Sequence, residues 1–94
     1  MKESPETAIE RVARMERLFD EVGAALDAGA DVYSDAALFE ALRTLDAYMD
    51  GGQWLCDYAL DERGALPKTL KRGVLSEDGL YNLLTEAQER RRNA

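Results

Sequence analysis

The sequence predicts an all-α protein, a small helical bundle built on a long antiparallel helical hairpin with two shorter C-terminal helices. Apolar residues recur three or four positions apart over long stretches, which is the spacing of one face of a helix. Glycine and proline interrupt these stretches where helices would end. No stretch of useful length alternates apolar and polar residues as a half-buried strand does. With 94 residues, the chain is expected to form a single domain over residues 1–94, with frayed ends.

The first helix is expected over residues 5–28. Ser4, Pro5 and Glu6 suit a helix start, because serine caps free N–H groups, proline tolerates the first turn and an acid meets the positive end of the helix dipole. The apolar stripe of this helix is Ala8, Val12, Met15, Phe19, Val22 and Leu26. Gly29 is expected to end it.

The second helix is expected over residues 34–50, after a short turn that makes the pair a hairpin. Ser34 is the predicted cap, with Asp35 beside it at the positive end of the dipole. The apolar stripe continues through Leu38, Leu42, Leu45 and Met49. Two glycines after Asp50 are expected to stop the helix, because glycine accepts the left-handed conformation that closes a helix end.

Two shorter helices are expected over residues 53–63 and 76–91, with one further helical turn over residues 68–72. Gly64 and Pro67 would end the first of them. We predict a positive φ at Gly73, which would let the chain reverse into a helix cap at Ser76.

The start of the last helix carries two acids and two apolar residues that fit this cap. Glu77 and Asp78 would lie in the first turn, at the positive end of the dipole. Leu75 would pack on Leu80 in the manner of a hydrophobic staple.

The charge of the chain is acidic and uneven. The net charge is −7, from 12 basic and 19 acidic residues, and Arg43 is the only basic residue between Leu18 and Glu62. Such a field repels phosphates, so we expect no direct nucleic-acid binding and a preference for a basic partner.

Composition also predicts where the protein resides. One cysteine permits no internal disulfide, which fits a reducing cytoplasm. No apolar run follows the N-terminus as in a signal peptide, and none approaches the roughly 20 residues of a membrane span. We therefore expect a cytoplasmic protein without membrane contact.

The residues that most enzymes and metal sites need are missing or explained otherwise. The chain has no histidine, which excludes a serine–histidine triad and the usual di-iron bundle. Cys56 is expected to be a buried structural residue, since free cysteine is usually buried. Asp57, Asp61 and Glu62 could hold a divalent cation, but the favoured interpretation is an exposed acidic face or ion pairs with Lys71 and Arg72. We expect no cofactor, no metal and no catalytic residue.

Three aromatic residues, Trp54, Tyr58 and Tyr81, have two interpretations. They could close the core over the C-terminal half, which is the favoured one because small cores need their aromatics. They could also form an interface, since tyrosine and tryptophan combine an apolar body with a polar tip.

The stretch WLCDYALDERGALPKTLKRGVLSEDGLYNLL, Trp54–Leu84, resembles a bacterial family of small proteins known as domain of unknown function 4298. Its most specific part is the run Leu70–Asp78. The resemblance implies a small bacterial protein without an assigned activity, and it supplies no catalytic residues.

The run Leu70–Asp78 leaves two interpretations open. Lys71 and Arg72 could pair with nearby carboxylates and hold two helices together at a corner, or the corner could recognise a partner. The candidate partner-binding residues are Trp54, Asp57, Tyr58, Asp61, Glu62, Lys71, Arg72, Glu77, Asp78 and Tyr81.

The leading hypothesis is a non-enzymatic module of bacterial or phage origin that binds a protein partner. An alternative is an inhibitor that imitates nucleic acid and blocks a basic nuclease or a bacterial defence complex, as anti-CRISPR proteins do. The moderate charge and the basic stretches 68–72 and 90–92 speak against this alternative. A homodimer through the hairpin is expected if the last helix leaves part of the apolar stripe uncovered.

Overall fold

The computed structural model describes residues 5–76 and 78–93. It contains α1 (Pro5–Asp27), α2 (Ala36–Asp50), α3 (Gln53–Glu62), the short 3₁₀ turn η1 (Gly73–Leu75) and α4 (Gly79–Asn93). The described residues form no strand, so the predicted all-α class is confirmed. The proposed roles of Ser4 and Glu77 fall outside the described residues.

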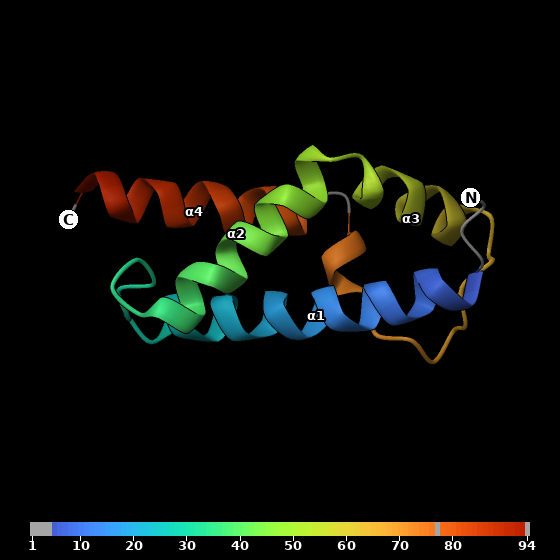
Figure 1. The fold of residues 1–94 in the computed structure, drawn as a ribbon, viewed down its shortest axis with the longest axis horizontal. Coiled ribbons are helices and arrows are strands. Elements are labelled where there is room, and N and C mark those ends of the chain that lie inside the picture. Colours follow the sequence, from blue (N-terminus) through green and yellow to red (C-terminus); the bar gives the residue numbers. More distant parts are fainter. Residues whose placement is uncertain (1–4, 77, 94) are drawn as a thin grey trace.

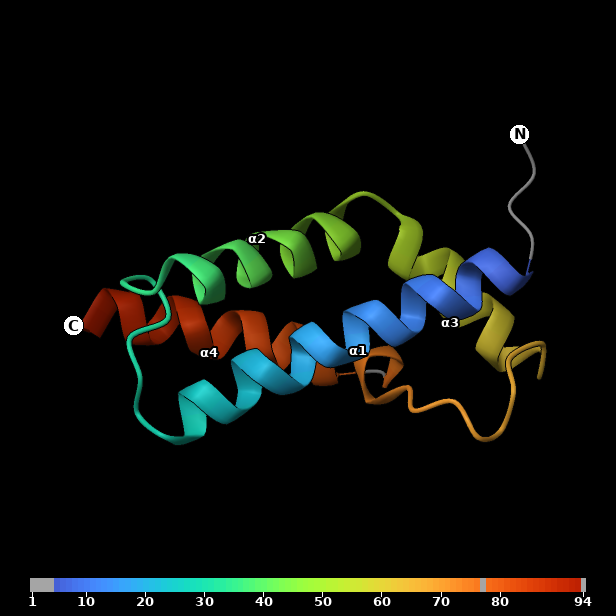
Figure 2. The same cartoon turned by 60° about the horizontal axis from the view of Figure 1, so that its bottom comes forward.

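The longest helix, α1, is the element on which the others pack. It contacts α2, α3, α4 and η1. Figures 1 and 2 show α3 beside the N-terminal half of α1 and α4 beside its C-terminal half, with α2 running back at an angle to α1. Each long segment therefore covers a different part of the same helix.

α1 ends as predicted, at a glycine with a positive φ. Gly29 has φ 78°, and the N–H groups of Gly29 and Ala30 donate to the carbonyls of Leu26 and Ala25 at 3.0 and 2.9 Å. These two hydrogen bonds form a Schellman motif, which satisfies carbonyls that the helix leaves open. The same arrangement ends α3 at Gly64, with φ 73°.

The start of α2 corrects the prediction of a serine cap. Asp35 caps the helix, because its Oδ1 accepts from the N–H groups of Ala37 and Leu38 at 2.9 and 3.1 Å. Ser34 instead donates its hydroxyl to Asp31 at 2.7 Å. This bond and one from the Tyr33 N–H lower the pKa of Asp31. The residue directly before α2 therefore caps the helix, and the Ser34 hydroxyl belongs to the preceding turn.

The segment between α3 and α4 differs most from the sequence prediction. No helix forms over residues 68–72, where the Leu70 N–H donates to the Pro67 carbonyl at 3.1 Å in an isolated turn. The short 3₁₀ helix described between α3 and α4 is η1, over Gly73–Leu75. α4 begins at Gly79, three residues later than predicted, and Asp78 rather than Ser76 accepts the first helical hydrogen bond, from Asn82 at 2.8 Å. Ser76 closes η1, donating its N–H to Gly73 at 3.0 Å.

Gly73 does not have the positive φ that the sequence predicted. A side chain here would be crowded instead, because a Cβ would lie 3.3 Å from Glu16 Oε2 and 3.6 Å from the Phe19 ring. A carboxylate therefore approaches the backbone of η1 closely.

The core is one cluster built from α1, α2, η1, α4 and the segments between them, and Trp54 and Leu60 of α3 pack against it. Its buried apolar members from α1 are Ala8, Val12, Met15, Val22 and Leu26. α2 supplies Ala41, Leu42, Leu45 and Tyr48, and the C-terminal part supplies Leu66, Val74, Leu75, Leu80, Leu83, Leu84 and Ala87. Leu75 and Leu80 are both buried, as the staple interpretation requires. Within the described residues, no helix has both the length and the apolar character needed to cross a bilayer.

Candidate functional site

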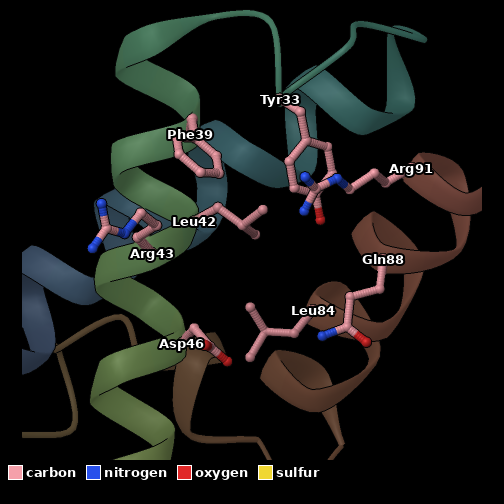
Figure 3. Close-up of a pocket in the computed structure, with 8 residues that line it drawn as sticks. All are labelled: Tyr33, Phe39, Leu42, Arg43, Asp46, Leu84, Gln88 and Arg91. Atoms are coloured by element: carbon pink, nitrogen blue, oxygen red, sulfur yellow. The ribbon is translucent and has the colours of Figure 1, made fainter.

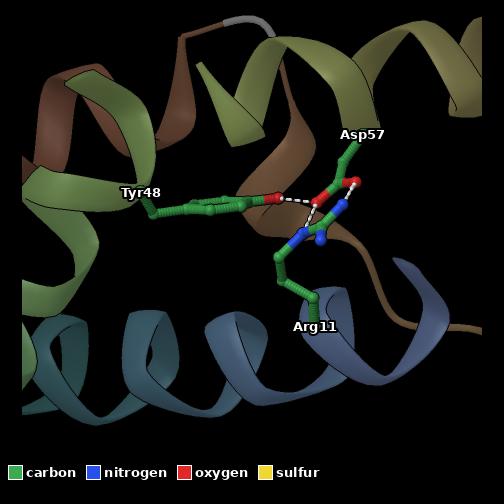
Figure 4. A network of polar contacts seen from close by, with 3 residues as sticks. All are labelled: Arg11, Tyr48 and Asp57. Carbon is green, nitrogen blue, oxygen red and sulfur yellow. Dashed lines mark hydrogen bonds and ion pairs between the residues drawn. The ribbon is translucent and has the colours of Figure 1, made fainter. Parts of the chain in front are cut away.

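Asp57, one of the predicted partner-binding residues, lies at the centre of a buried polar network (Figure 4). Arg11 of α1 donates to it twice: Nε lies 2.8 Å from Oδ2, and a terminal nitrogen forms an ion pair with Oδ1. Tyr48 of α2 donates its hydroxyl to Oδ2 at 2.7 Å. The carboxylate thus joins three helices, and both of its oxygens are occupied.

Burial and hydrogen bonding shift the titration of the other two groups. The hydrogen bond to Asp57 raises the pKa of Arg11. The pKa of Tyr48 is raised mainly by burial and, to a smaller extent, by the hydrogen bond to Asp57. Arg11 therefore stays charged and Tyr48 stays neutral over the ordinary pH range.

The prediction that Asp57 belongs to an exposed acidic face of α3 is wrong. Asp57 is fully buried, Asp61 pairs with Arg72 at 2.9 Å, and Glu62 is exposed. The three carboxylates therefore have three different environments. In residues 5–76 and 78–93, no group of three or more histidine, cysteine or acidic side chains could hold a metal ion.

The corner at residues 70–76 is tied to the rest of the protein by four contacts of Val74 and Arg72. The Val74 N–H donates to the buried Glu16 carboxylate at 2.8 Å, and Trp54 Nε1 donates to the Val74 carbonyl at 2.9 Å. Arg72 donates to the carbonyl of Pro67 at 2.8 Å besides pairing with Asp61. These contacts match the structural interpretation of the corner. Lys71 is different, since it is highly exposed and lies 3.6 Å from Asp20.

The three aromatic candidates do not gather in one place. Trp54 and Tyr58 stack on each other with ring centroids 5.0 Å apart, and both are half-buried. Tyr81 is 61% exposed and lies on α4. Trp54 packs against the core, as the core interpretation expects, and Tyr58 stacks on Trp54, whereas the interpretation does not extend to Tyr81.

Cys56 also departs from its prediction, because it is exposed. The buried side of α3 carries Asp57, and Cys56 lies with Leu55 and Ala59 on the outer side, where Leu55 is 64% exposed. The helix is apolar on its outer face too, so the usual rule that free cysteine is buried failed here.

A concave surface runs between α2 and α4. Its first half is a cavity of about 190 Å³, with Tyr33, Phe39, Leu42 and Arg43 on one side and Leu84, Gln88 and Arg91 on the other. Its second half, of about 340 Å³, is lined by Met49 and Asp50 of α2 and by Tyr81 and Thr85 of α4. Asp46, Leu84 and Gln88 line both halves, so the two halves adjoin, and we call them together the α2–α4 groove.

The groove has an apolar floor. Figure 3 shows Leu42 and Leu84 pointing toward the space between the two helices, with the Tyr33 and Phe39 rings at one end. Tyr33 and Phe39 have ring centroids 5.9 Å apart, and the Arg91 guanidinium lies 4.7 Å from the Tyr33 ring centroid. At the other end lie Met49, which is half-buried, and Tyr81.

Of the residues that line the groove, the sequence predicted only Tyr81 as a partner-binding residue. The other lining residues come from segments about 40 positions apart, and their side chains look like ordinary members of amphipathic stripes. The signal available in the sequence was Phe39, a large apolar residue beside the apolar stripe of residues 38–49. In the structure its side chain is 36% exposed. Arg11, Glu16 and Tyr48 were also missed as polar partners, because their contacts join distant segments.

Comparison with known proteins gives one match. A family model with the description "Domain of unknown function (DUF4298)" matches residues 12–92. No curated protein and no solved structure matches the chain. The family that the stretch Trp54–Leu84 resembles is therefore confirmed, and the match covers residues 12–92.

Proposed function

The chain belongs to this family of unknown function, and we propose that it is a non-enzymatic protein-interaction module whose α2–α4 groove binds a segment of a protein partner. The observation that carries the proposal is the concave, partly apolar surface between two helices. Concave sites of this kind between helices are common places for binding.

Exposed aromatic residues at both ends of the groove support this role. Phe39 is 36% exposed at one end and Tyr81 is 61% exposed at the other. Aromatic residues contribute a large share of the energy at protein interfaces because they bury a large area at a small entropy cost. A partner that covers both ends would remove both rings from water.

The buried carboxylates of Asp57 and Glu16 bind other parts of the chain, which supports a non-enzymatic role. Asp57 is held by Arg11 and Tyr48, and Glu16 accepts from the Val74 backbone. A general base needs a carboxylate that can reach a substrate, and both of these are occupied inside the core.

The same burial gives less support to the nucleic-acid imitation. An imitation of phosphates needs carboxylates displayed on the surface. Asp57 and Glu16 are buried, and Asp61 is engaged with Arg72. The α2–α4 groove is also lined by arginines at one end, which would repel a basic nuclease.

Site-specific photo-crosslinking in the native cells tests the proposal. We would place benzoyl-phenylalanine at position 81, where it replaces an exposed tyrosine, and separately at position 88, inside the groove. We expect both positions to capture the same protein. The control is position 17, an exposed residue of α1.

The readout is the mass and identity of the crosslinked species. Capture of one protein at positions 81 and 88 and not at position 17 supports the proposal. Absence of any crosslink at the groove positions, or equal capture at position 17, would contradict it.

A further inference from the structure

From the charges and shape of the α2–α4 groove we infer the chemistry of its partner: an amphipathic α-helix of about three turns, basic at one end and acidic at the other. The inference rests on the proposed function, because it describes what the same groove binds. The basic end would lie over Asp46 and Asp50, and the acidic end over Arg43 and Arg91.

The shape of the groove favours a helix over an extended strand. Both walls are helices, whose backbone groups are already bonded within the helix. An extended segment placed between them would bury N–H and C=O groups without partners, which is costly. A helix satisfies its own backbone and presents only side chains to the apolar floor of Leu42 and Leu84.

The length of the groove sets the length of the helix. On α2 the groove runs from Phe39 to Asp50, eleven residue steps, or about 16 Å at 1.5 Å per residue. This length matches about three turns of a partner helix. Apolar side chains at positions i, i+4 and i+7 of that helix would lie on the floor between Leu42 and Leu84.

The charges at the two ends of the groove have opposite sign. Asp50 lies in the half that Tyr81 lines and Asp46 borders both halves, whereas Arg43 and Arg91 lie only in the half that Tyr33 and Phe39 line. Within residues 5–76 and 78–93, no ion pair involves Asp46, Asp50 or Arg43. Arg91 is engaged only with the face of the Tyr33 ring among these residues. These four charges are therefore available to a partner of complementary pattern.

The experiment uses three synthetic 14-residue helical peptides that share leucine at positions 4, 8 and 11. Their sequences are stapled, so that all three are equally helical. One carries lysines at one end and glutamates at the other, one carries lysines at both ends, and one carries glutamates at both ends. Fluorescence anisotropy gives the dissociation constant of each for the full-length protein.

We expect the peptide with opposite ends to bind wild type, and D46K/D50K to weaken that binding about tenfold, since two exposed charge contacts become repulsive. The all-glutamate peptide should then become the best ligand of D46K/D50K. In Arg43→Glu the all-lysine peptide should gain affinity instead. The matched control is E21K/D27K, which makes the same change of net charge at two exposed positions of α1 and should bind like wild type.

Three results would overturn the inference. One is no binding of the opposite-ended peptide at millimolar concentration, and another is equal weakening by D46K/D50K and E21K/D27K. The third is a stable dimer in light scattering that Tyr81→Lys dissociates, which would assign the groove to a second copy of the chain. If crosslinking at position 81 captures a protein while the peptides fail, the proposed function stands and only the helix chemistry falls.

Discussion

The buried Asp57 carboxylate gives the sharpest prediction about stability. Asp57→Asn keeps the shape of the side chain and removes its charge, so the Arg11 guanidinium, 6% exposed, remains buried beside a neutral amide. Removing one partner of a buried ion pair costs about 3–5 kcal/mol, and we expect about 3 because asparagine keeps some of the hydrogen bonds. At about 0.05–0.15 kcal/mol per residue, this chain has a total stability of about 5–14 kcal/mol.

Urea unfolding followed by circular dichroism at 222 nm measures this loss. With a slope of about 1.5 kcal/mol per molar urea, the midpoint should fall by about 2 M. The matched control is Asp61→Asn, which breaks a partly exposed pair with Arg72 and should cost about 1 kcal/mol or less.

A rescue variant separates loss of the pair from loss of shape. Replacing the network with apolar residues of similar size, as R11M/Y48F/D57L, should recover most of the stability lost in Asp57→Asn, because no buried charge is left without a partner. The reasoning is refuted if Asp57→Asn costs no more than Asp61→Asn, because the buried pair would then contribute no more than a surface pair.

Three further predictions concern the same body of the protein. Burial raises the pKa of Tyr48, so its contribution to stability is present below pH about 10 and is lost as pH rises above that value. The advantage of wild type over Tyr48→Phe in urea unfolding should shrink by about 1 kcal/mol from pH 10 to 11. A constant difference across that range would contradict the burial of the hydroxyl. Glu16→Ala should lower the free energy of unfolding by about 1–3 kcal/mol in thermal unfolding, because the buried Val74 N–H loses its acceptor. Glu16→Gln keeps a carbonyl oxygen and should lower it less; equal losses would mean that this hydrogen bond is unimportant. Arg72→Glu should lower the free energy of unfolding by about 1 kcal/mol, since the pair of Arg72 with Asp61 is partly exposed, and should leave the helicity and the mass in light scattering unchanged. Global unfolding of this variant would mean that the fold depends on the contacts of the corner.

Local chemistry explains why the helices could be predicted from the sequence. The three-or-four spacing of apolar residues predicted all four α-helices, and the ends of α1 and α3 at Gly29 and Gly64 follow from the conformational freedom of glycine. Two of the local predictions that failed concern the starts of helices. Asp35 rather than Ser34 caps α2, and α4 begins at Gly79, where the Asp78 carbonyl rather than that of Ser76 accepts the first helical hydrogen bond.

The tertiary structure decided which polar residues meet and where the surface is concave. Arg11 and Asp57 are 46 positions apart and Glu16 and Val74 are 58 apart, so their contacts depend on how α1 packs against α3 and η1. The α2–α4 groove likewise exists only because two distant helices lie near each other without filling the space between them. Periodicity specifies which face of each helix is apolar. It does not specify the angle and spacing at which two such faces meet, because these depend on the side chains of both helices together.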